Sequence, residues 1–381
     1  MLNSVPAQSA VRQPRSIVKV GVGGVNSGVV MPGWISWSVE NNSFYAADTF
    51  RVTFAISMLP PQFDAAWWAQ QTDIYIEIFA GFPANPENGG YESTDLTSLI
   101  YGKSDELTFD PVRRVIEIRG RDLTSTMIDT KTTEKWQNKT ASQIATLLAA
   151  RHGLTPAVTA TKTVTGTYYQ LDHVTMTDQR SEWDLLAYLA NKEQFNVYIA
   201  GQTLHFEPVA APSAEPFVLQ WQPPTKDNAS PVLNATEFSF SRTLTIAKGV
   251  AVVVRSWNMK NKKGFTVTWP SKGKGIQAGK ASPFGGQQIY SFVLPNRSQQ
   301  EALVFAQAKY KEITAHEYKL DASLPADNVL TTRTLIQVEG TGTPFDQTYY
   351  PDTITRDFSM DEGYIMRIHA KNHSPQSVVQ P

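Results

Sequence analysis

The chain has 381 residues, a formal net charge of −1 and no cysteine. That length predicts two to four domains, since one core rarely organises so long a chain. The missing cysteines exclude disulfide scaffolds, thiolate zinc sites and cysteine nucleophiles. The near-zero charge argues against a protein whose main task is to grip nucleic acid. Hydrophobic residues make up 41% of the chain, which is enough to form buried hydrophobic cores. Charged residues make up only 18%, and we therefore expect part of the surface to be covered by partner proteins.

The N-terminal residues lack the basic start and apolar stretch of a secretion signal, and the apolar runs are too short to cross a bilayer. We therefore expect a soluble chain, made in the cytosol, with no membrane insertion.

Period-two alternation of apolar residues dominates the chain. It predicts strands around residues 50–56, 74–79, 116–119 and 335–339. Some of these carry apolar side chains on both faces, which predicts burial from both sides. Residues 244–257 and 265–269 are expected to form a hairpin across a basic loop, 259–264.

Helical periodicity is evident in three places. Thr140 and Gln143 form a predicted capping box, and the following apolar face ends at Gly153 and contains Ile144, Leu147 and Leu148. A second helix is expected from Ser181, with Trp183, Leu186 and Leu189 on its apolar face. A third is expected from Ser298, with Leu303, Ala306, Tyr310 and Ile313.

Two stretches, 209–216 and 223–231, are rich in proline and small residues and are interpreted as interdomain linkers. The fold class is therefore mainly β with a smaller α+β part. The expected order is a β-rich domain, an α+β domain, a connecting segment and a β-rich domain with one helix, at residues 16–129, 130–206, 207–231 and 232–376.

The search for chemistry predicts no catalytic, metal or cofactor site. The six histidines are scattered without a metal-binding pair. His173 follows Asp172 and could act as an oriented base, but an ordinary hydrogen-bonded histidine is the preferred interpretation. The glycine-rich stretch 21–28 is interpreted as a turn between strands, because extended residues and Pro32 follow it where a phosphate loop needs a helix. Paired carboxylates brought together by the fold remain open.

A basic cluster with aromatic neighbours lies in the C-terminal half. Its lysines are Lys260, Lys262, Lys263, Lys272, Lys274 and Lys280, and its aromatics are Trp257, Phe265 and Trp269. Such a cluster can bind single-stranded nucleic acid. A solvated hairpin tip is the preferred interpretation, and an acidic protein partner ranks between the two.

Three stretches, in their order and spacing, carry a resemblance: residues 115–129, 136–145 and 181–206. They resemble the baseplate hub proteins of contractile-tailed phages, the Mu-type and late-control-protein-D-type hubs. The signature positions, for which structural roles are expected, are Gly120, Arg121, Asp122, Thr124, Asp129, Trp136, Asn138, Thr140 and Trp183. We expect Gly120 to allow a sharp exit from its strand, and the charged pair after it to fix the turn.

The resemblance covers about residues 16–373 and departs from the family at an acidic insertion, 85–95, expected on an outer loop. It implies a homotrimer in which two similar antiparallel β-barrel domains per chain, 16–129 and 232–376, build a tube-like ring. The ring would join the sixfold tail tube to the threefold central spike and let DNA pass without tight binding. Residues 130–206 would face other baseplate proteins. The protein would then be a non-enzymatic part of the virion tail, without a cofactor, assembled in the host cytoplasm.

Three alternatives remain. The first is a tail-tip module that binds host carbohydrate, with Trp67, Trp68 and Tyr91 as stacking aromatics. The second is a cell-wall hydrolase. The third is the hub of a phage-tail-like bacteriocin or injection particle, which the sequence cannot separate from an infectious phage.

Overall fold

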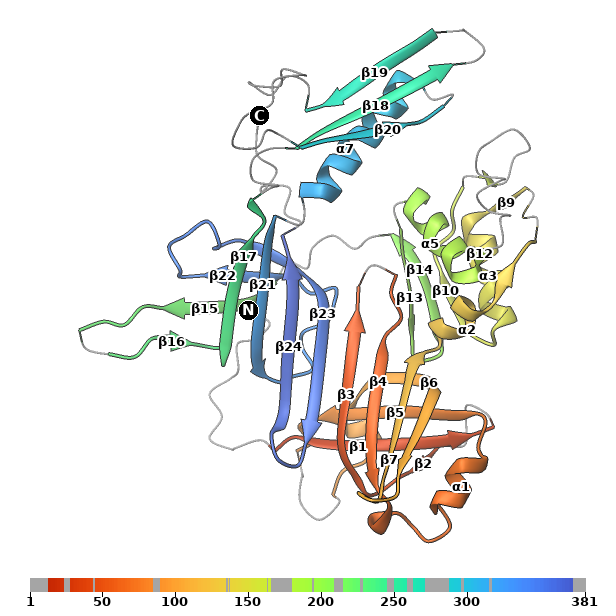
Figure 1. The fold of residues 1–381 in the computed structure, drawn as a ribbon, viewed down its shortest axis with the longest axis vertical. Coiled ribbons are helices and arrows are strands. Elements are labelled where there is room, and N and C mark those ends of the chain that lie inside the picture. The colour runs from red at the N-terminus through yellow and green to blue at the C-terminus, as the bar shows by residue number, and fades with distance from the viewer. Residues whose placement is uncertain are drawn as a thin grey trace.

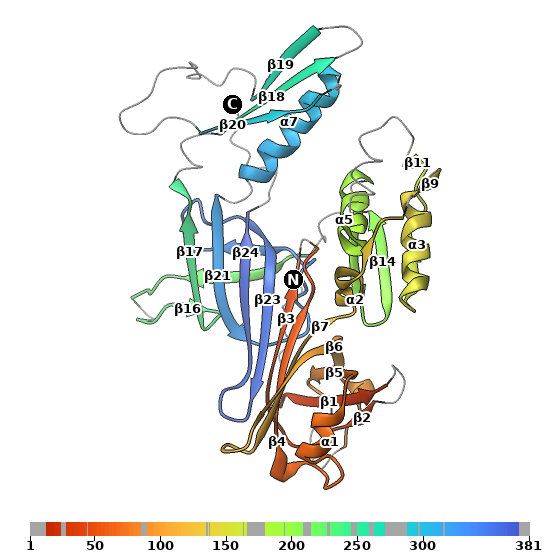
Figure 2. The ribbon, with the colours of Figure 1, turned by 45° about the vertical axis from the view of Figure 1, so that its right-hand side comes forward.

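A computed structural model describes residues 13–372, apart from positions 24–27, 44, 85–89, 135, 137, 163, 166–179, 194, 209–214, 227–228, 245–249, 259–262, 271–287, 296–297 and 315–316. Figures 1 and 2 show a large sheet, a compact α/β unit beside it and a smaller α/β unit at one end of the long axis. We call the last two the outer unit (residues 124–208) and the distal unit (residues 250–314).

The first seven strands form the N-terminal lobe, at the bottom of Figure 1. Their alternating apolar residues face inward, as the periodicity predicts, and the predicted strands at 50–56, 74–79 and 116–119 are confirmed as β4, β5 and β7. The lobe also holds short helices that the periodicity did not predict. Its elements are β1 (Arg15–Val22), β2 (Val29–Val30), β3 (Trp34–Asn42), β4 (Thr49–Ala55), η1 (Ile56–Met58), α1 (Ala65–Gln70), β5 (Ile74–Gly81), η2 (Ser93–Asp95), β6 (Thr97–Asp110) and β7 (Val115–Asp122).

The C-terminal lobe contains seven more strands. The predicted strand at 335–339 is confirmed as β22, and the segment expected as a connection, 207–231, contributes β15 and the approach to β16. The strands are β15 (Phe217–Gln222), β16 (Val232–Leu233), β17 (Glu237–Arg242), β21 (Tyr318–Pro325), β22 (Ile336–Glu339), β23 (Thr348–Ser359) and β24 (Gly363–Lys371).

The two lobes share one mixed sheet of 14 strands. Its main path runs β16-β15-β22-β23-β3-β4-β7-β6-β5-β1-β2, with β24, β21 and β17 branching from β23. The lobes meet where β3 pairs with β23, antiparallel, from Asn42↔Thr353 to Ser36↔Ser359. We predicted two separate β-barrels; among the described residues the ladders join the halves instead, and none closes into a barrel.

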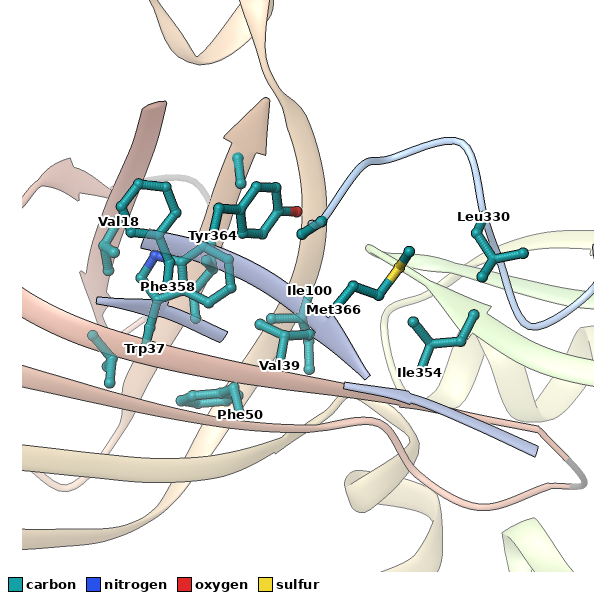
Figure 3. Close-up of a cluster of buried hydrophobic side chains, with 14 of the residues drawn as sticks. Val18, Trp37, Val39, Phe50, Ile100, Leu330, Ile354, Phe358, Tyr364 and Met366 are labelled. Carbon is teal, nitrogen blue, oxygen red and sulfur yellow. The ribbon is translucent and has the colours of Figure 1, made fainter. Parts of the chain in front are cut away.

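One hydrophobic core crosses this junction. Trp37 from β3 lies 5.7 Å, ring to ring, from Phe358 of β23 and 5.8 Å from Tyr364 of β24. Figure 3 shows these rings together with Val39, Ile354 and Met366, all of them buried. At roughly 1.5–3 kcal/mol for each fully buried large apolar side chain, the shared core holds the lobes together far more strongly than the ladder alone.

The outer unit follows β7 and has its own core, built around Met127, Leu148, Leu186 and Phe206. Two helices lie against a three-stranded sheet of order β10-β14-β13. The elements are α2 (Thr124–Asp129), β8 (Lys131–Thr132), β9 (Lys139–Thr140), α3 (Ala141–Arg151), β10 (Thr155–Val158), β11 (Val164–Thr165), β12 (Arg180–Ser181), α5 (Glu182–Glu193), β13 (Phe195–Ala200) and β14 (Thr203–Pro208).

The distal unit is inserted between β17 and β21. A sheet of order β19-β18-β20 carries one helix on one face, around Val252, Val254 and Ala306. The predicted hairpin is confirmed, because β18 and β19 pair antiparallel; residues 245–249 of its expected first strand lie outside the described residues. The elements are β18 (Val250–Asn258), β19 (Lys263–Trp269), β20 (Gln288–Val293) and α7 (Gln299–Thr314).

The three predicted helices are confirmed as α3, α5 and α7, but one predicted core residue is wrong. Leu147 is 43% exposed, whereas Ile144 and Leu148 are fully buried. The buried arc of α3 is completed by Ala141, Ala145 and Ala149, which turns Leu147 toward solvent. The small alanine side chains let α3 approach its neighbours closely. The spacing of the large apolar residues alone did not indicate which face of the helix is buried.

The capping box of α3 is present as predicted. The Thr140 side chain accepts from the Gln143 backbone amide at 3.3 Å, and the Gln143 side chain accepts from the Thr140 amide at 3.0 Å. Replacing Thr140 with Ala should lower the free energy of unfolding by about 1 kcal/mol, because the Gln143 backbone amide loses its acceptor. Thr140→Ser keeps the hydroxyl and should stay close to wild type in urea unfolding. Equal midpoints for all three proteins would show that the box does not stabilise the helix.

Candidate functional site

The Gly-Arg-Asp signature begins inside the sheet. Gly120 lies within β7, between β4 and β6. A Cβ here would sit 2.2 Å from the Lys103 carbonyl oxygen and 2.6 Å from the Phe50 ring, and Gly102 on β6 meets the same ring. The prediction of a sharp strand exit is therefore wrong. The glycine is needed because Phe50 and a neighbouring strand approach its backbone closely.

Arg121 binds carboxylates from two other elements. Its Nε and Nη2 donate to the two oxygens of Asp105 at 2.7 and 2.8 Å, and Nη2 also donates to Asp129 at 3.0 Å. These bonds tie β7 to β6 and to α2, and they raise the pKa of the guanidinium. Arg121 does not bind Asp122, because adjacent strand residues point to opposite faces, and each of the two has its own partners at the end of β7.

Asp122 is buried and starts α2. Its carboxylate accepts from the Thr124 amide at 3.1 Å and the Thr124 hydroxyl at 2.9 Å. Burial, and then the nearby Asp48, raise its pKa well above the usual value. Burial likewise raises the pKa of Asp48 to about 6, although Asn42 and Asn41 donate to it. Two carboxyl groups of raised pKa thus lie where β7 leaves the sheet.

A buried arginine bridges the two lobes beside this pair. Arg356 on β23 is 4% exposed. It donates to the carbonyl oxygens of Asp327 (2.9 Å) and Leu330, and to the side-chain oxygen of Asn41 at 3.2 Å. Asn41 in turn donates to Asp48 at 2.8 Å. Burial lowers the pKa of the guanidinium. A polar network therefore runs from β23 through β3 to the β3–β4 loop.

Besides Thr124 and Asp129 in α2, four signature residues lie in the outer unit. Trp136 is buried under Arg151, whose guanidinium carbon is 5.7 Å from the ring centre. Asn138 has a φ of 55° and leads into the cap at Thr140. Trp183 packs in the core between α5 and its neighbours. All four shape the backbone or the core of this unit.

Besides the Arg121–Asp129 bond, two further groups of contacts among the described residues hold the outer unit against the lobes. Trp183 Nε1 donates to the carbonyl oxygen of Tyr45 at 2.6 Å, and the Tyr45 hydroxyl donates to the Phe195 carbonyl at 3.2 Å. On the other lobe, the guanidinium carbon of Arg333 lies 4.1 Å from the ring centre of Tyr198. Neither Tyr45 nor Arg333 was predicted, because loop residues carry no periodicity.

The described residues offer little for catalysis. Within them, no three histidine or acidic side chains gather as a metal site, and no helix is long and apolar enough to span a membrane. His152 contacts the buried Glu182 at 2.6 Å, which links the end of α3 to the start of α5. His173 lies outside the described residues. The glycine-rich stretch joins β1 and β2, which pair antiparallel as the turn interpretation requires.

A pocket of about 650 Å³ opens beside the start of α3. Polar and apolar side chains line it, and none of them is a carboxylate or a histidine. The lining residues are Asn138, Lys139, Ser142, Gln143, Thr146, Leu147, Val158 and Ala160. Nothing in this set resembles an acid–base pair or a nucleophile with its base.

Trp67 and Trp68, considered above as aromatics that could stack on a carbohydrate, do not present exposed rings for a sugar. Trp68 is 1% exposed and stacks on Phe54, at 5.8 Å between ring centres. Trp67 is half-buried against Phe63, with 4.8 Å between their centres. That interpretation of Trp67 and Trp68 is wrong, because α1 turns both toward the core. Of the predicted lysine cluster, only Lys263 lies among the described residues, exposed on β19.

Comparison with known proteins decides what this architecture resembles. No family model and no curated protein matches the sequence. Among solved structures, a tail protein from Neisseria meningitidis MC58 is similar with a TM-score of 0.64 at 14% identity, over 94% of this chain and 96% of that one.

The chain has the phage tail-protein fold.

Two further structures share this fold. The 43 kDa tail protein of prophage MuSo2 from Shewanella oneidensis gives a TM-score of 0.62 at 14% identity, over 94% of this chain and 98% of that one. The E. coli c3393 protein, a type VI secretion component described as similar to the T4 tail proteins gp27 and gp5, gives 0.50 at 10% identity, over 95% and 79%. The tail-protein resemblance predicted from residues 115–206 is thereby confirmed for the fold.

Replacing Gly120 with Ala tests the tight approach in β7. The added methyl group must displace the Lys103 carbonyl or the Phe50 ring, so the free energy of unfolding should fall by about 2–3 kcal/mol. Gly28→Ala is the matched control, because its nearest neighbour would be an ordinary 3.5 Å contact with Lys19. Urea unfolding followed by tryptophan fluorescence measures both. Similar losses at the two positions would contradict the role given to Gly120.

Proposed function

We propose that this protein is the structural hub of a contractile tail baseplate. Three copies form a ring that joins the sixfold tail tube on one face to the threefold central spike on the other. The observation that carries the proposal is the tail-protein fold, which extends over nearly the whole length of both this chain and its structural relatives.

The arrangement of the lobes supports a ring. One chain supplies two β-rich lobes joined edge to edge at β3 and β23, so three chains would supply six in a row. The tube-like domains are the two lobes within residues 16–129 and 232–376, with β15 of the connecting segment 207–231 added and the distal unit excluded from the second range. The outer domain, 130–206, faces neighbouring baseplate proteins.

The proposed role is non-enzymatic and needs no cofactor. Signature residues from Gly120 to Trp183 hold backbone, core and unit junctions, which suits a scaffold. DNA passes through the ring without tight binding, in keeping with a net charge of −1. The protein is assembled in the host cytoplasm and ends in the virion, at the tail baseplate.

A second candidate is the same hub in a particle that carries no phage genome. The similarity to the E. coli type VI secretion component favours it. In that case the ring would join a tube to a spike in a bacteriocin or an injection device.

The proposal predicts a trimer. Three chains of 42.3 kDa give about 127 kDa, which size exclusion with light scattering at tens of micromolar measures directly. Mixing with the cognate tube and spike proteins should then yield a complex in which each binds a different face of the ring. A chain that stays monomeric alone and with the spike would contradict the hub role.

A further inference from the structure

Charge is distributed very unevenly along this nearly neutral chain. Residues 238–300 contain ten lysines and arginines and no aspartate or glutamate. Since the whole chain carries −1, the remaining residues carry −11. The basic stretch spans all three strands of the distal unit in sequence, and of its ten basic residues Arg242, Arg255 and Lys263 lie among the described residues.

Among the described residues, one face of the distal sheet has no element packed on it, and we call it the open face. Helix α7 covers the face of β18 that carries Val252 and Val254. The opposite face carries Arg255 and Trp257, and the latter is 55% exposed. In register, Arg255 lies beside Val293, which is 73% exposed, and Trp257 lies beside Gly264. A Cβ on Gly264 would sit 2.9 Å from the Trp257 ring, so the indole rests on the sheet with its other side free.

This composition is that of a protein interface. Tryptophan and arginine are the residues that contribute most to binding energy at such surfaces, and exposed aliphatic side chains beside them supply area to bury. Ile289, also on the open face, is 52% exposed. A nucleic-acid surface would use stacked aromatic side chains and would gain little from Ile289 and Val293. The open face therefore favours an acidic protein partner.

The complementary surface is present on the same chain. Residues 52–112 contain nine aspartates and glutamates and one lysine. They include α1, β5 and β6, and their exposed acidic side chains include Glu92, Asp95, Glu106 and Asp105, the last of which is bound to Arg121. Figures 1 and 2 place these elements at the opposite end of the molecule from the distal unit. The two charged regions cannot meet within one chain.

We propose that the open face of β18–β20 in one copy docks on the acidic surface of residues 52–112 in a neighbouring copy. Opposite charges at opposite ends favour head-to-tail contacts and disfavour contacts between like ends. This inference rests on the proposed function, since three head-to-tail contacts close into a ring.

Cross-linking tests the contact directly. Equal amounts of unlabelled and nitrogen-15-labelled protein are mixed, and a carbodiimide joins lysines to carboxylates that touch. Mass spectrometry should find mixed-isotope peptides that link residues 238–300 of one copy to residues 52–112 of another. Intermolecular links that consistently avoid this pair of regions would overturn the docking proposal.

Charge reversal gives an independent test in the full chain. Arg255→Glu should weaken the trimer about tenfold or more, measured as the concentration at which it dissociates. The control, Lys131→Glu, makes the same charge change on an exposed residue of the outer unit and should leave the trimer intact. Circular dichroism confirms that both variants fold.

The outcomes separate the two proposals. A trimer of about 127 kDa that neither substitution affects would overturn the docking and leave the hub role standing. A salt-sensitive dimer with the predicted cross-links would support the docking and contradict the trimeric hub. An unchanged trimer whose retention of a single-stranded oligonucleotide depends on Arg255 would assign the face to nucleic acid and overturn the docking.

Discussion

The ladder between β3 and β23 is the interaction on which the rest of the structure depends. It pairs residues that are more than 300 positions apart, from Asn42↔Thr353 onward. Closing so long a loop costs conformational entropy, although this cost grows only slowly with loop length. Burial of apolar side chains in the shared core around Trp37 and Phe358 offsets it. Because the lobes are fused in this way, neither β-rich segment has to close into a barrel of its own.

The other parts are held around this junction. The outer unit follows β7 directly, held by the hydrogen bonds from Thr124 to Asp122 and by the Arg121 bonds to Asp105 and Asp129. The distal unit leaves between β17 and β21, at the far edge of the sheet. Each unit has a separate core, so each can present its own surface while the fused lobes keep their relative orientation.

Local features were predictable from sequence, and long-range ones were not. Alternation identified β4, β5 and β7, and the Thr140 capping box located α3, because these signals come from neighbouring residues. The pairing of β3 with β23 left no local trace. Gly120 was recognised as special, but its cause, the Phe50 ring from another strand, is a tertiary contact. Trp68 likewise appeared available to a ligand until α1 placed it in the core.

The most direct test of the fused junction is the stability of Arg356→Met beside that of Arg367→Met. Arg356 is buried and binds groups from both lobes, whereas Arg367, on the neighbouring strand, forms a half-exposed ion pair with Asp357. We predict that Arg356→Met lowers the free energy of unfolding by about 3 kcal/mol, because buried carbonyls and Asn41 lose their donor, while Arg367→Met costs under about 1 kcal/mol. Equal, small losses for both variants would show that the lobes do not depend on this junction.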